Sequence, residues 1–292
     1  MKDLIVNADD LGWTAGVNRG IAEAHRNGIV TSASILANGP AFDDAVILAH
    51  SLPALGVGVH LNLSDGAPLS GAKNVPTLVG ENGQLSAGPE QLLVKLARRK
   101  LKLAEVEREW DAQISKIAAA GISPTHLDGH KHVHMLPGLF PLALKLARKH
   151  SIAAIRIALE ASSLRAALSG KDGRNSSTEF KQGVQARGLK LLARDAHKLA
   201  DKAGIESTDY FCGISQTGVM THYGVLNLLE NLPDGSTELM CHPGYLDDDL
   251  AHSATRLQDS RAAELAILAD TAVRKSVASH GIRLINYSQL AN

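Results

Sequence analysis

Four histidines and one aspartate lie within a single short stretch of the chain. The stretch 125–135 reads THLDGHKHVHM, and these side chains are His126, Asp128, His130, His132 and His134. Neutral imidazoles are common ligands of divalent metals, and a nearby carboxylate can fix the tautomer of each ring. One catalytic ion takes about three protein ligands and keeps an open position, so not every histidine can be a ligand. We expect a metal site that uses part of this stretch; the alternative is a solvated run of histidines that binds metal adventitiously.

Two adjacent acids lie near the start of the chain, in the sequence NADDLG at 7–12. Asp9 and Asp10 repel each other unless a cation lies between or beside them. They follow the apolar, strand-like run 4–6, and the carboxyl ends of strands carry the active site in α/β barrels. The alternative is that these acids only cap a helix and face solvent. The pair is a second group of candidate site residues.

Three single polar residues interrupt or follow other apolar segments. His60 stands in GVGVHLNL at 56–63, Arg156 follows Ala154-Ile155, and His242 opens the sequence HPG after Cys241. A lone histidine in such a strand is usually a core residue, and a histidine before Pro-Gly can be only part of a turn. Both gain weight because each stands at the end of a predicted strand. A buried arginine needs an anionic partner, and the simplest partner is one of the two N-terminal aspartates.

The elements that must position these residues alternate between strand-like and helix-like patterns. Short apolar runs predict strands at 4–6, 32–36, 56–63, 125–127, 154–157, 209–211, 237–241 and 283–285. Helical periodicity predicts helices at 17–28, 42–50, 91–120, 138–150, 189–203, 225–231 and 260–279. About eight such units favour an α/β fold with a closed or nearly closed parallel barrel, and an open doubly wound sheet is the competitor. The candidate residues would then share one rim.

The length and apolar content favour one domain. A chain of 292 residues with 45% hydrophobic residues can fill a sizeable core, and no linker divides 1–292. Two stretches, 64–89 and 162–188, are rich in Gly, Pro, Ser or charged residues and lack periodicity. Loops of this length in a compact domain are often functional, so both are candidates for covering the site.

The charge balance narrows the classes of partner. The 30 basic residues equal the 30 acidic residues, and aromatic residues make up only 3% of the chain. This composition argues against nucleic acid and anionic membranes and favours a neutral small substrate. The two cysteines, Cys212 and Cys241, lack the spacing of a structural zinc site. With no apolar run long enough to span a membrane and no secretory leader pattern, we expect a cytoplasmic protein, and a homodimer stays open.

Four motifs together resemble a known family. NADDLG, GVHLNL, THLDGHKHVHMLPG and CHPG occur in this order between residues 7 and 244. Their combination resembles the YdjC/ChbG/HpnK family of carbohydrate deacetylases over nearly the whole chain. The resemblance implies a distorted (β/α) barrel of the polysaccharide-deacetylase type, with one divalent ion held by one aspartate and two histidines. Matched motif to motif, it implies Asp10, His60 and His130 as the metal ligands.

The same resemblance assigns roles to the neighbouring residues. It implies Asp9 as general base, His242 as general acid and Arg156 as the arginine that orients the base. The remaining members of the histidine stretch would support the ligands or contact substrate, with His134 expected nearest to a bound ligand; they are Asp128, His126, His132 and His134. Two imidazoles and one carboxylate suit Zn²⁺, Co²⁺ or Ni²⁺ better than Mg²⁺. Because the family is described with magnesium, the prediction keeps both Zn²⁺ and Mg²⁺.

The implied activity is hydrolysis of the N-acetyl group of a small amino sugar to a free amine and acetate. The residues leave open which sugar this is, among chitobiose-like disaccharides, other N-acetyl glycosides and a glycolipid precursor. Two other functions also stay open. A phosphate-ester hydrolase would use a basic rim, which Arg165, Lys171, Arg174 and Lys181 could supply. A non-catalytic metal-binding or glycan-binding protein would need neither Asp9 nor His242.

Overall fold

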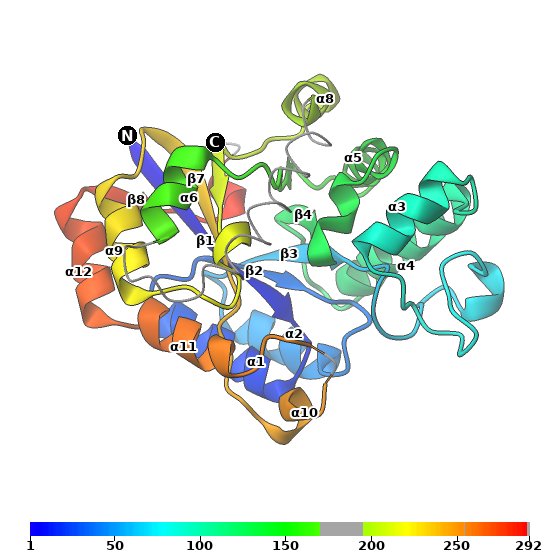
Figure 1. Ribbon diagram of the computed structural model, residues 1–292, viewed down its shortest axis with the longest axis horizontal. Coiled ribbons are helices and arrows are strands. Elements are labelled where there is room, and N and C mark those ends of the chain that lie inside the picture. Colours follow the sequence, from blue (N-terminus) through cyan, green and yellow to red (C-terminus); the bar gives the residue numbers. More distant parts are fainter. Residues whose placement is uncertain (170–194, 254, 291–292) are drawn as a thin grey trace.

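The computed structural model describes residues 1–169, 195–253 and 255–290 (Figure 1). Eight strands of the described residues form one parallel sheet in the order β5-β4-β3-β2-β1-β7-β6, with β8 paired to β1. They are β1 Lys2–Leu11, β2 Ser32–Ile35, β3 Gly56–Leu61, β4 His126–Gly129, β5 Ala154–Ile155, β6 Tyr210–Cys212, β7 Gly235–Cys241 and β8 Ile282–Leu284. Each of the eight predicted strands is present.

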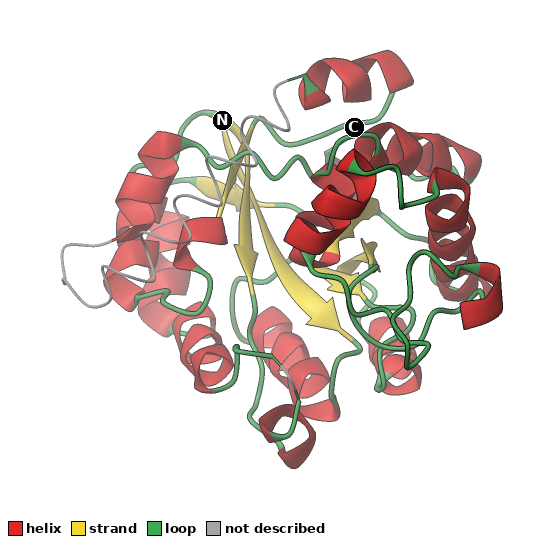
Figure 2. Ribbon diagram, turned by 45° about the vertical axis from the view of Figure 1, so that its right-hand side comes forward, coloured by secondary structure: helices red, strands yellow, loops and turns green. Residues whose placement is uncertain are grey.

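The sheet curls into an incomplete barrel in which β1 pairs with three other strands. That strand pairs with β7 along one side, and its other side is shared between β8 at Lys2–Leu4 and β2 from Asn7 onward. Between β5 and β6 the described chain makes only two isolated bridges, Ala154 with Glu206 and Glu160 with Phe211. Helices surround the outside of the curled sheet (Figure 2). The predicted distorted (β/α) barrel is confirmed, and the open doubly wound sheet is not the fold.

The described helices follow the predicted alternation with the strands. They are α1 Ala15–Arg26, α2 Phe42–Ser51, α3 Pro89–Ala97, α4 Leu103–Ala119, α5 Leu139–Lys149, α6 Ser162–Ser169, α8 Ala196–Ala203, α9 His222–Glu230, α10 Asp248–Ala251, α11 Asp259–Leu268 and α12 Thr271–Ser279. Helix α5 buries Leu139, Leu142 and Leu146, spaced to form one apolar stripe against the sheet. Within the described ranges, no helix is both long and apolar enough to cross a membrane.

Two predicted helices are each divided in the structure. The range 91–120 holds α3 and α4, and the chain between them takes a left-handed turn at Arg99 (φ 55°). The range 260–279 holds α11 and α12, because the Asp270 side chain accepts from the Ala272 N–H and starts a new helix. The predicted loop 162–188 begins as helix α6. Its remainder from 170, and the predicted helix 189–203 before 195, lie outside the described residues.

Loop 64–89 is fixed to α4 by buried acids. The Glu109 carboxylate accepts hydrogen bonds from the backbone N–H groups of Leu69 (3.0 Å) and Ser70 (2.9 Å). The Glu105 carboxylate accepts from both the N–H and the hydroxyl of Thr77 (both 2.7 Å). A buried carboxylate is tolerated only when such donors satisfy it, so loop and helix depend on each other. The predicted loop is therefore anchored to α4 at two places, at Leu69–Ser70 and at Thr77.

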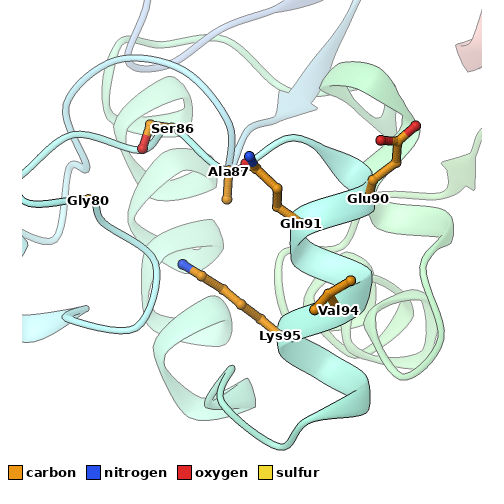
Figure 3. A pocket seen from close by; sticks show the side chains of 7 residues that line it. All are labelled: Gly80, Ser86, Ala87, Glu90, Gln91, Val94 and Lys95. Carbon is orange, nitrogen blue, oxygen red and sulfur yellow. The ribbon is translucent and has the colours of Figure 1, made fainter.

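Loop 64–89 and α3 also line an open pocket of about 420 Å³. Its walls are Gly80, Ser86, Ala87, Glu90, Gln91, Val94 and Lys95 (Figure 3). The Lys95 ammonium donates to the carbonyl oxygen of Thr77, which ties the helix to the loop. None of the lining residues belongs to the site predicted from the sequence.

We predict that Glu109→Ala lowers the free energy of unfolding by about 2–4 kcal/mol, because it leaves buried N–H groups of the loop without an acceptor. Urea denaturation measures the loss, and limited proteolysis should cut first within 64–89. The matched control is Glu107→Ala on the same helix, which removes a surface pair with Lys145 and should cost less than about 1 kcal/mol. Equal losses in the two variants would contradict the anchoring role.

Candidate active site

An irregularity near the end of β1 brings two adjacent acids to one place. Neighbouring side chains of a regular strand point to opposite faces. Here the register against β2 shifts between Ala8 and Leu11, and Asp10 takes a left-handed conformation (φ 71°). As a result Asp9 Oδ2 lies 4.0 Å and Asp10 Oδ1 lies 3.5 Å from the same atom, Nε2 of His60. The bulge makes both carboxylates part of one site.

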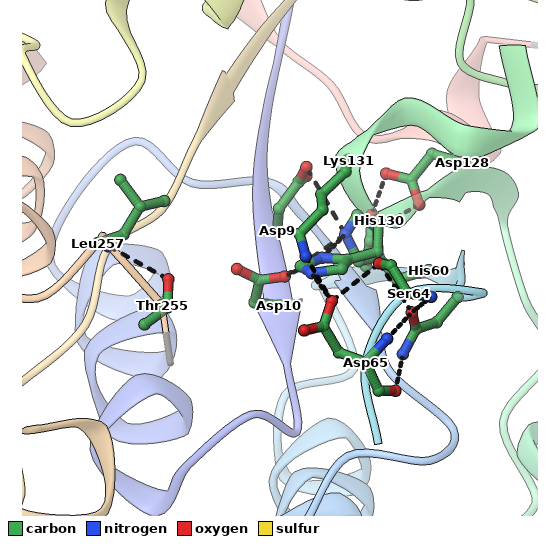
Figure 4. A network of polar contacts seen from close by, with 12 residues as sticks. Asp9, Asp10, His60, Ser64, Asp65, Asp128, His130, Lys131, Thr255 and Leu257 are labelled. Atoms are coloured by element: carbon green, nitrogen blue, oxygen red, sulfur yellow. Dashed lines mark hydrogen bonds and ion pairs between the residues drawn. The ribbon is translucent and has the colours of Figure 1, made fainter. Parts of the chain in front are cut away.

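Three ligand-type atoms face one another at the carboxyl ends of β1, β3 and β4 (Figure 4). Asp10 Oδ1 lies 2.9 Å from His130 Nδ1, which lies 3.3 Å from His60 Nε2. All three residues are buried, and the three atoms lie within 4.8 Å of one another. The 2.9 Å approach lacks hydrogen-bond geometry, and Asp10 Oδ1 accepts no hydrogen bond from any residue that the structure describes. Two imidazole nitrogens and an unsatisfied carboxylate oxygen fit a divalent ion.

The charge balance of the surroundings also fits a cation. Around this triad the described chain buries five carboxyl groups but only two guanidinium groups; they are Asp9, Asp10, Asp128, Glu238, Glu264, Arg156 and Arg261. Burial lowers the pKa of His60, but Asp128 and Asp9 outweigh it and raise this pKa to about 10. Burial raises the pKa of Glu264 to about 7. Protons on His60 and Glu264 thus balance part of the negative charge, and a divalent ion would supply positive charge in their place.

Asp128 sets the orientation of the His60 ring. The Nδ1–H of His60 donates to Asp128 Oδ1 at 2.7 Å, so Nε2 faces Asp10. The second oxygen of Asp128 accepts from the Ser34 hydroxyl (2.7 Å) and lies 2.8 Å from Arg156 Nη1. Burial raises the pKa of Asp128, but Arg156 and His60 outweigh it and lower this pKa. The carboxylate remains charged and fixes the orientation of the His60 ring, with Nδ1–H toward Asp128.

Arg156 holds Asp9 with both ends of its guanidinium group. Its Nη1 lies 2.8 Å from Asp9 Oδ2, and its Nη2 lies 2.7 Å from Asp9 Oδ1. Its Nε donates to Glu238 Oε1 at 2.9 Å, and the arginine is fully buried. Burial raises the pKa of Asp9, but Arg156 and then His60 lower it, so the carboxylate is ionised beside the triad. The anionic partner expected for Arg156 is therefore Asp9.

His242 follows β7 and carries an unsatisfied ring nitrogen. Its backbone N–H donates to Glu264 Oε2 at 2.6 Å. Its Nδ1 is buried and makes no hydrogen bond within the described chain. Burial lowers the pKa of His242 to about 4, against the opposing effect of Asp9 and Asp10. The imidazole is neutral, and it shares the electrostatic environment of the two N-terminal acids.

Comparison with known proteins places the chain in a family. The model of the family described as YdjC-like protein matches residues 3–279. The chain belongs to the YdjC-like family. A carbohydrate deacetylase of Geobacillus stearothermophilus is 35% identical over 286 residues, which cover 98% of this chain and 96% of that protein. A chitooligosaccharide deacetylase of Salmonella paratyphi B is 34% identical over 285 residues, with 96% of each chain covered.

A solved structure supports the same relationship. It is that of a candidate cellobiose-phosphate cleavage protein from Enterococcus faecalis V583, with a TM-score of 0.77 and 30% identity. The match covers 100% of this chain and 99% of the other. The resemblance expected from the four motifs, to the YdjC-like family, is thereby confirmed.

The three remaining histidines of the stretch 125–135 do not belong to the triad and contact other residues of this YdjC-like chain. The His126 ring stacks on Tyr287 with centroids 3.9 Å apart, and its Nε2 lies 3.2 Å from the Ser34 hydroxyl. His132 packs edge-on against Phe211. The Nε2 of His134, a fully buried residue, donates to the carbonyl oxygen of Arg156 at 3.0 Å. His134 therefore supports the strand end that carries Arg156, whereas we expected it nearest to a bound ligand.

Several residues of the site were missed by sequence reasoning. They are Asn7, Ser34, Asp65, Glu238, Arg261 and Glu264. Glu238 carried a usable signal, because it is an acid inside the apolar strand β7. Arg261 of α11 donates to Asp10 Oδ2 at 2.6 Å and so leaves Oδ1 for the triad. Nothing local distinguishes it from a solvated helical arginine.

We predict that Zn²⁺ stabilises the metal-free protein by about 3 kcal/mol at a free concentration near 100 times its Kd, since the ion binds only the folded triad. Thermal and urea unfolding with and without Zn²⁺ measure this shift. His130→Ala should lose it, and His126→Ala, in the same stretch but outside the triad, should keep it. A full shift in His130→Ala would remove His130 from the ligand set.

Proposed function

We propose that this chain is a metal-dependent deacetylase that hydrolyses the N-acetyl group of an amino sugar to a free amine and acetate. The observation that carries the proposal is the Asp10, His60 and His130 triad beside Asp9, a carboxylate held by Arg156. Relatives named carbohydrate deacetylase and chitooligosaccharide deacetylase, each covering 96% or more of this chain, support it. The substrate class we propose is a small N-acetylated carbohydrate, in line with these names.

The ion would be held by Asp10 Oδ1, His60 Nε2 and His130 Nδ1. This donor set favours Zn²⁺, Co²⁺ or Ni²⁺ over Mg²⁺, which prefers oxygen ligands, so we propose Zn²⁺ with Mg²⁺ as the competitor to test. When bound, the ion supplies a positive charge that polarises a carbonyl oxygen and acidifies water. His60 donates its Nδ1–H to Asp128, and Asp10 Oδ2 accepts from Arg261, so one defined atom of His60 and one of Asp10 are left for this purpose.

Asp9 is the proposed general base. Both of its oxygens contact Arg156, and Oδ2 also lies 4.0 Å from His60 Nε2, the atom proposed to hold the ion. Its lowered pKa keeps it ready to accept a proton from the attacking water. Arg156 fixes the direction in which the carboxylate points. The Nδ2 of Asn7 adds a third hydrogen bond, at 2.9 Å from Asp9 Oδ1.

His242 is the proposed general acid. An amide nitrogen leaves poorly unless it is protonated as the C–N bond breaks. The ring nitrogen Nδ1 of His242 makes no hydrogen bond in the described chain and lies 4.0 Å from Glu264 Oε2. The ring is neutral before substrate binds, so the proton that it donates would come from the Glu264 carboxyl, whose pKa burial raises to about 7. The backbone bond of His242 to Glu264 fixes the segment after β7 in place. Asp9 and His242 thus divide the proton transfers between water and amine.

We predict that Asp9→Asn reduces acetate release at least about 100-fold while the purified protein keeps its metal, because the side-chain shape stays and the base is lost. Acetate assays on a panel of N-acetyl sugars, with metal content determined in parallel, test this. The control is Asp3→Asn, an acid on the same strand that pairs with Arg283 at the surface. Retained turnover in Asp9→Asn would show that another group is the base.

A second candidate function is hydrolysis of a sugar phosphate ester. The Enterococcus faecalis structure is named as a candidate cellobiose-phosphate cleavage protein, which gives a phosphorylated sugar as its substrate but does not say which bond is cleaved. Of the four basic residues proposed for an anion-binding rim, only Arg165 lies within the described residues, in α6. Lys171, Arg174 and Lys181 lie outside them.

One panel of substrates separates these functions. We predict acetate release from N-acetyl sugars and no phosphate release from sugar phosphates under the same metal conditions. Phosphate release without acetate would establish the second candidate. If every sugar stays unchanged with Zn²⁺, Co²⁺, Ni²⁺ and Mg²⁺ while metal is bound, the chain is a binding protein.

A further inference from the structure

The second ring nitrogen of His130 faces an acid that the proposed mechanism does not use. His130 Nδ1 points inward, 2.9 Å from Asp10 and 3.3 Å from His60. His130 Nε2, on the opposite side of the ring, is buried, makes no hydrogen bond within the described chain and lies 3.3 Å from Asp65 Oδ2, in the first turn of loop 64–89 (Figure 4). We propose that Asp65 is a positioning residue for the metal site: its carboxylate holds the Nε2–H of His130 and thereby directs Nδ1 at the ion. This inference rests on the proposed metal site.

The backbone around Asp65 is fixed by one buried side chain. Asn62 Oδ1 accepts from the N–H groups of Ser64 (2.9 Å) and Asp65 (3.2 Å). Asn62 Nδ2 donates back to the carbonyl oxygen of Asp65 at 2.8 Å. The Ser64 hydroxyl donates to Asp65 Oδ2 at 2.8 Å. This turn follows directly from β3, the strand that carries His60, so Asp65 is placed by the same strand end as a metal ligand.

Lys131 also holds the Asp65 carboxylate in place. Its ammonium lies 2.6 Å from Asp65 Oδ2, the same oxygen that faces His130. The left-handed backbone of Lys131 (φ 53°) turns the chain sharply after His130 and belongs to the 3₁₀ segment 130–135. The carboxylate is therefore shared by the metal ligand and the residue next to it, and its position is set by both.

Each of the two proposed ligand histidines thus faces a carboxylate with the ring nitrogen that does not face the ion. His60 offers Nε2 and donates Nδ1–H to Asp128 at 2.7 Å. His130 offers Nδ1 and presents Nε2 to Asp65. Such carboxylates commonly change metal affinity 10–100-fold, about the effect expected here. Asp128 is fully buried, whereas the Asp65 side chain keeps 29% exposure at the rim.

The alternative is that Asp65 is only a surface partner of Lys131, and Asp111 provides a matched control. Asp111 pairs with a lysine and a histidine in the same way, Lys149 at 2.7 Å and His150 at 2.7 Å. Its side chain is 31% exposed, close to that of Asp65, and it lies on α4 outside the triad. If Asp65 is only a surface partner of Lys131, Asp65→Asn and Asp111→Asn should bind Zn²⁺ with the same affinity.

The test is Zn²⁺ affinity, measured by competition with a chromophoric chelator, on wild type, Asp65→Asn and Asp111→Asn. We expect Asp65→Asn to weaken Zn²⁺ binding about 10–100-fold and Asp111→Asn to leave it unchanged. Co²⁺-loaded protein gives a second readout, since its visible spectrum reports ligand geometry and should change only in Asp65→Asn. Wild-type affinity and spectrum in Asp65→Asn would overturn the inference. A wild type that binds neither ion would instead overturn the proposed metal site.

The Lys131→Ala variant tests whether Asp65 acts through its position beside His130 or only through its negative charge. If Asp65 acts only by its charge, removal of Lys131 makes the rim more negative and tightens Zn²⁺ binding. If Asp65 acts by position, Lys131→Ala frees the carboxylate and weakens Zn²⁺ binding several-fold, with no further effect once Asp65 is Asn. Tighter binding in Lys131→Ala would therefore contradict the proposal. This variant also keeps the question answerable if Asp65→Asn folds poorly.

Discussion

The buried guanidinium group of Arg156 is the charge on which the candidate site depends. Its nitrogens lie within 2.9 Å of carboxylates from three other strands, Asp9 of β1, Asp128 of β4 and Glu238 of β7. Burying such a cation costs several kcal/mol, and burying the acids without it would cost as much again. The four groups are therefore stable only together. Through Asp128 this cluster orients His60, so the triad of Asp10, His60 and His130 depends for its geometry on this salt-bridge network.

The parts of the site that the sequence predicts are those with a local signal. His60 and Arg156 each break an apolar strand pattern, and Asp9 and Asp10 end one, so their places at strand ends follow from a few neighbouring residues. Glu238 breaks a strand in the same manner and could have been found by the same rule. Arg261 could not, because its partner Asp10 is 251 residues away and a single arginine in an amphipathic helix carries no local signal. Asp65 likewise needs the folded turn of Asn62 before its proximity to His130 exists.

The fold shows the same division between local and distant causes. The eight strands were predictable because each is a short apolar run between polar segments. The breaks between α3 and α4 and between α11 and α12 were not, because helical periodicity continues in the sequence across both. The incomplete closure of the barrel between β5 and β6 was not predictable either. These strands have only two and three residues, and the chain next to them is joined by single bridges. The bulge at Asp10 is likewise a product of pairing with β2, which no property of the NADDLG motif alone reveals.

The attachment of loop 64–89 to α4 has a consequence for how this protein can change. Glu105 and Glu109 bind the loop chiefly through its backbone N–H groups, which every residue except proline possesses. The exposed side chains of the loop can therefore be replaced without releasing it from the helix, whereas Val75, Leu78 and Leu85 are buried in the core. The first turn, with Asp65 beside His130, is fixed separately by Asn62 at the end of β3. The anchor thus separates the sequence of the loop from its position, so that selection can act on its outward surface alone.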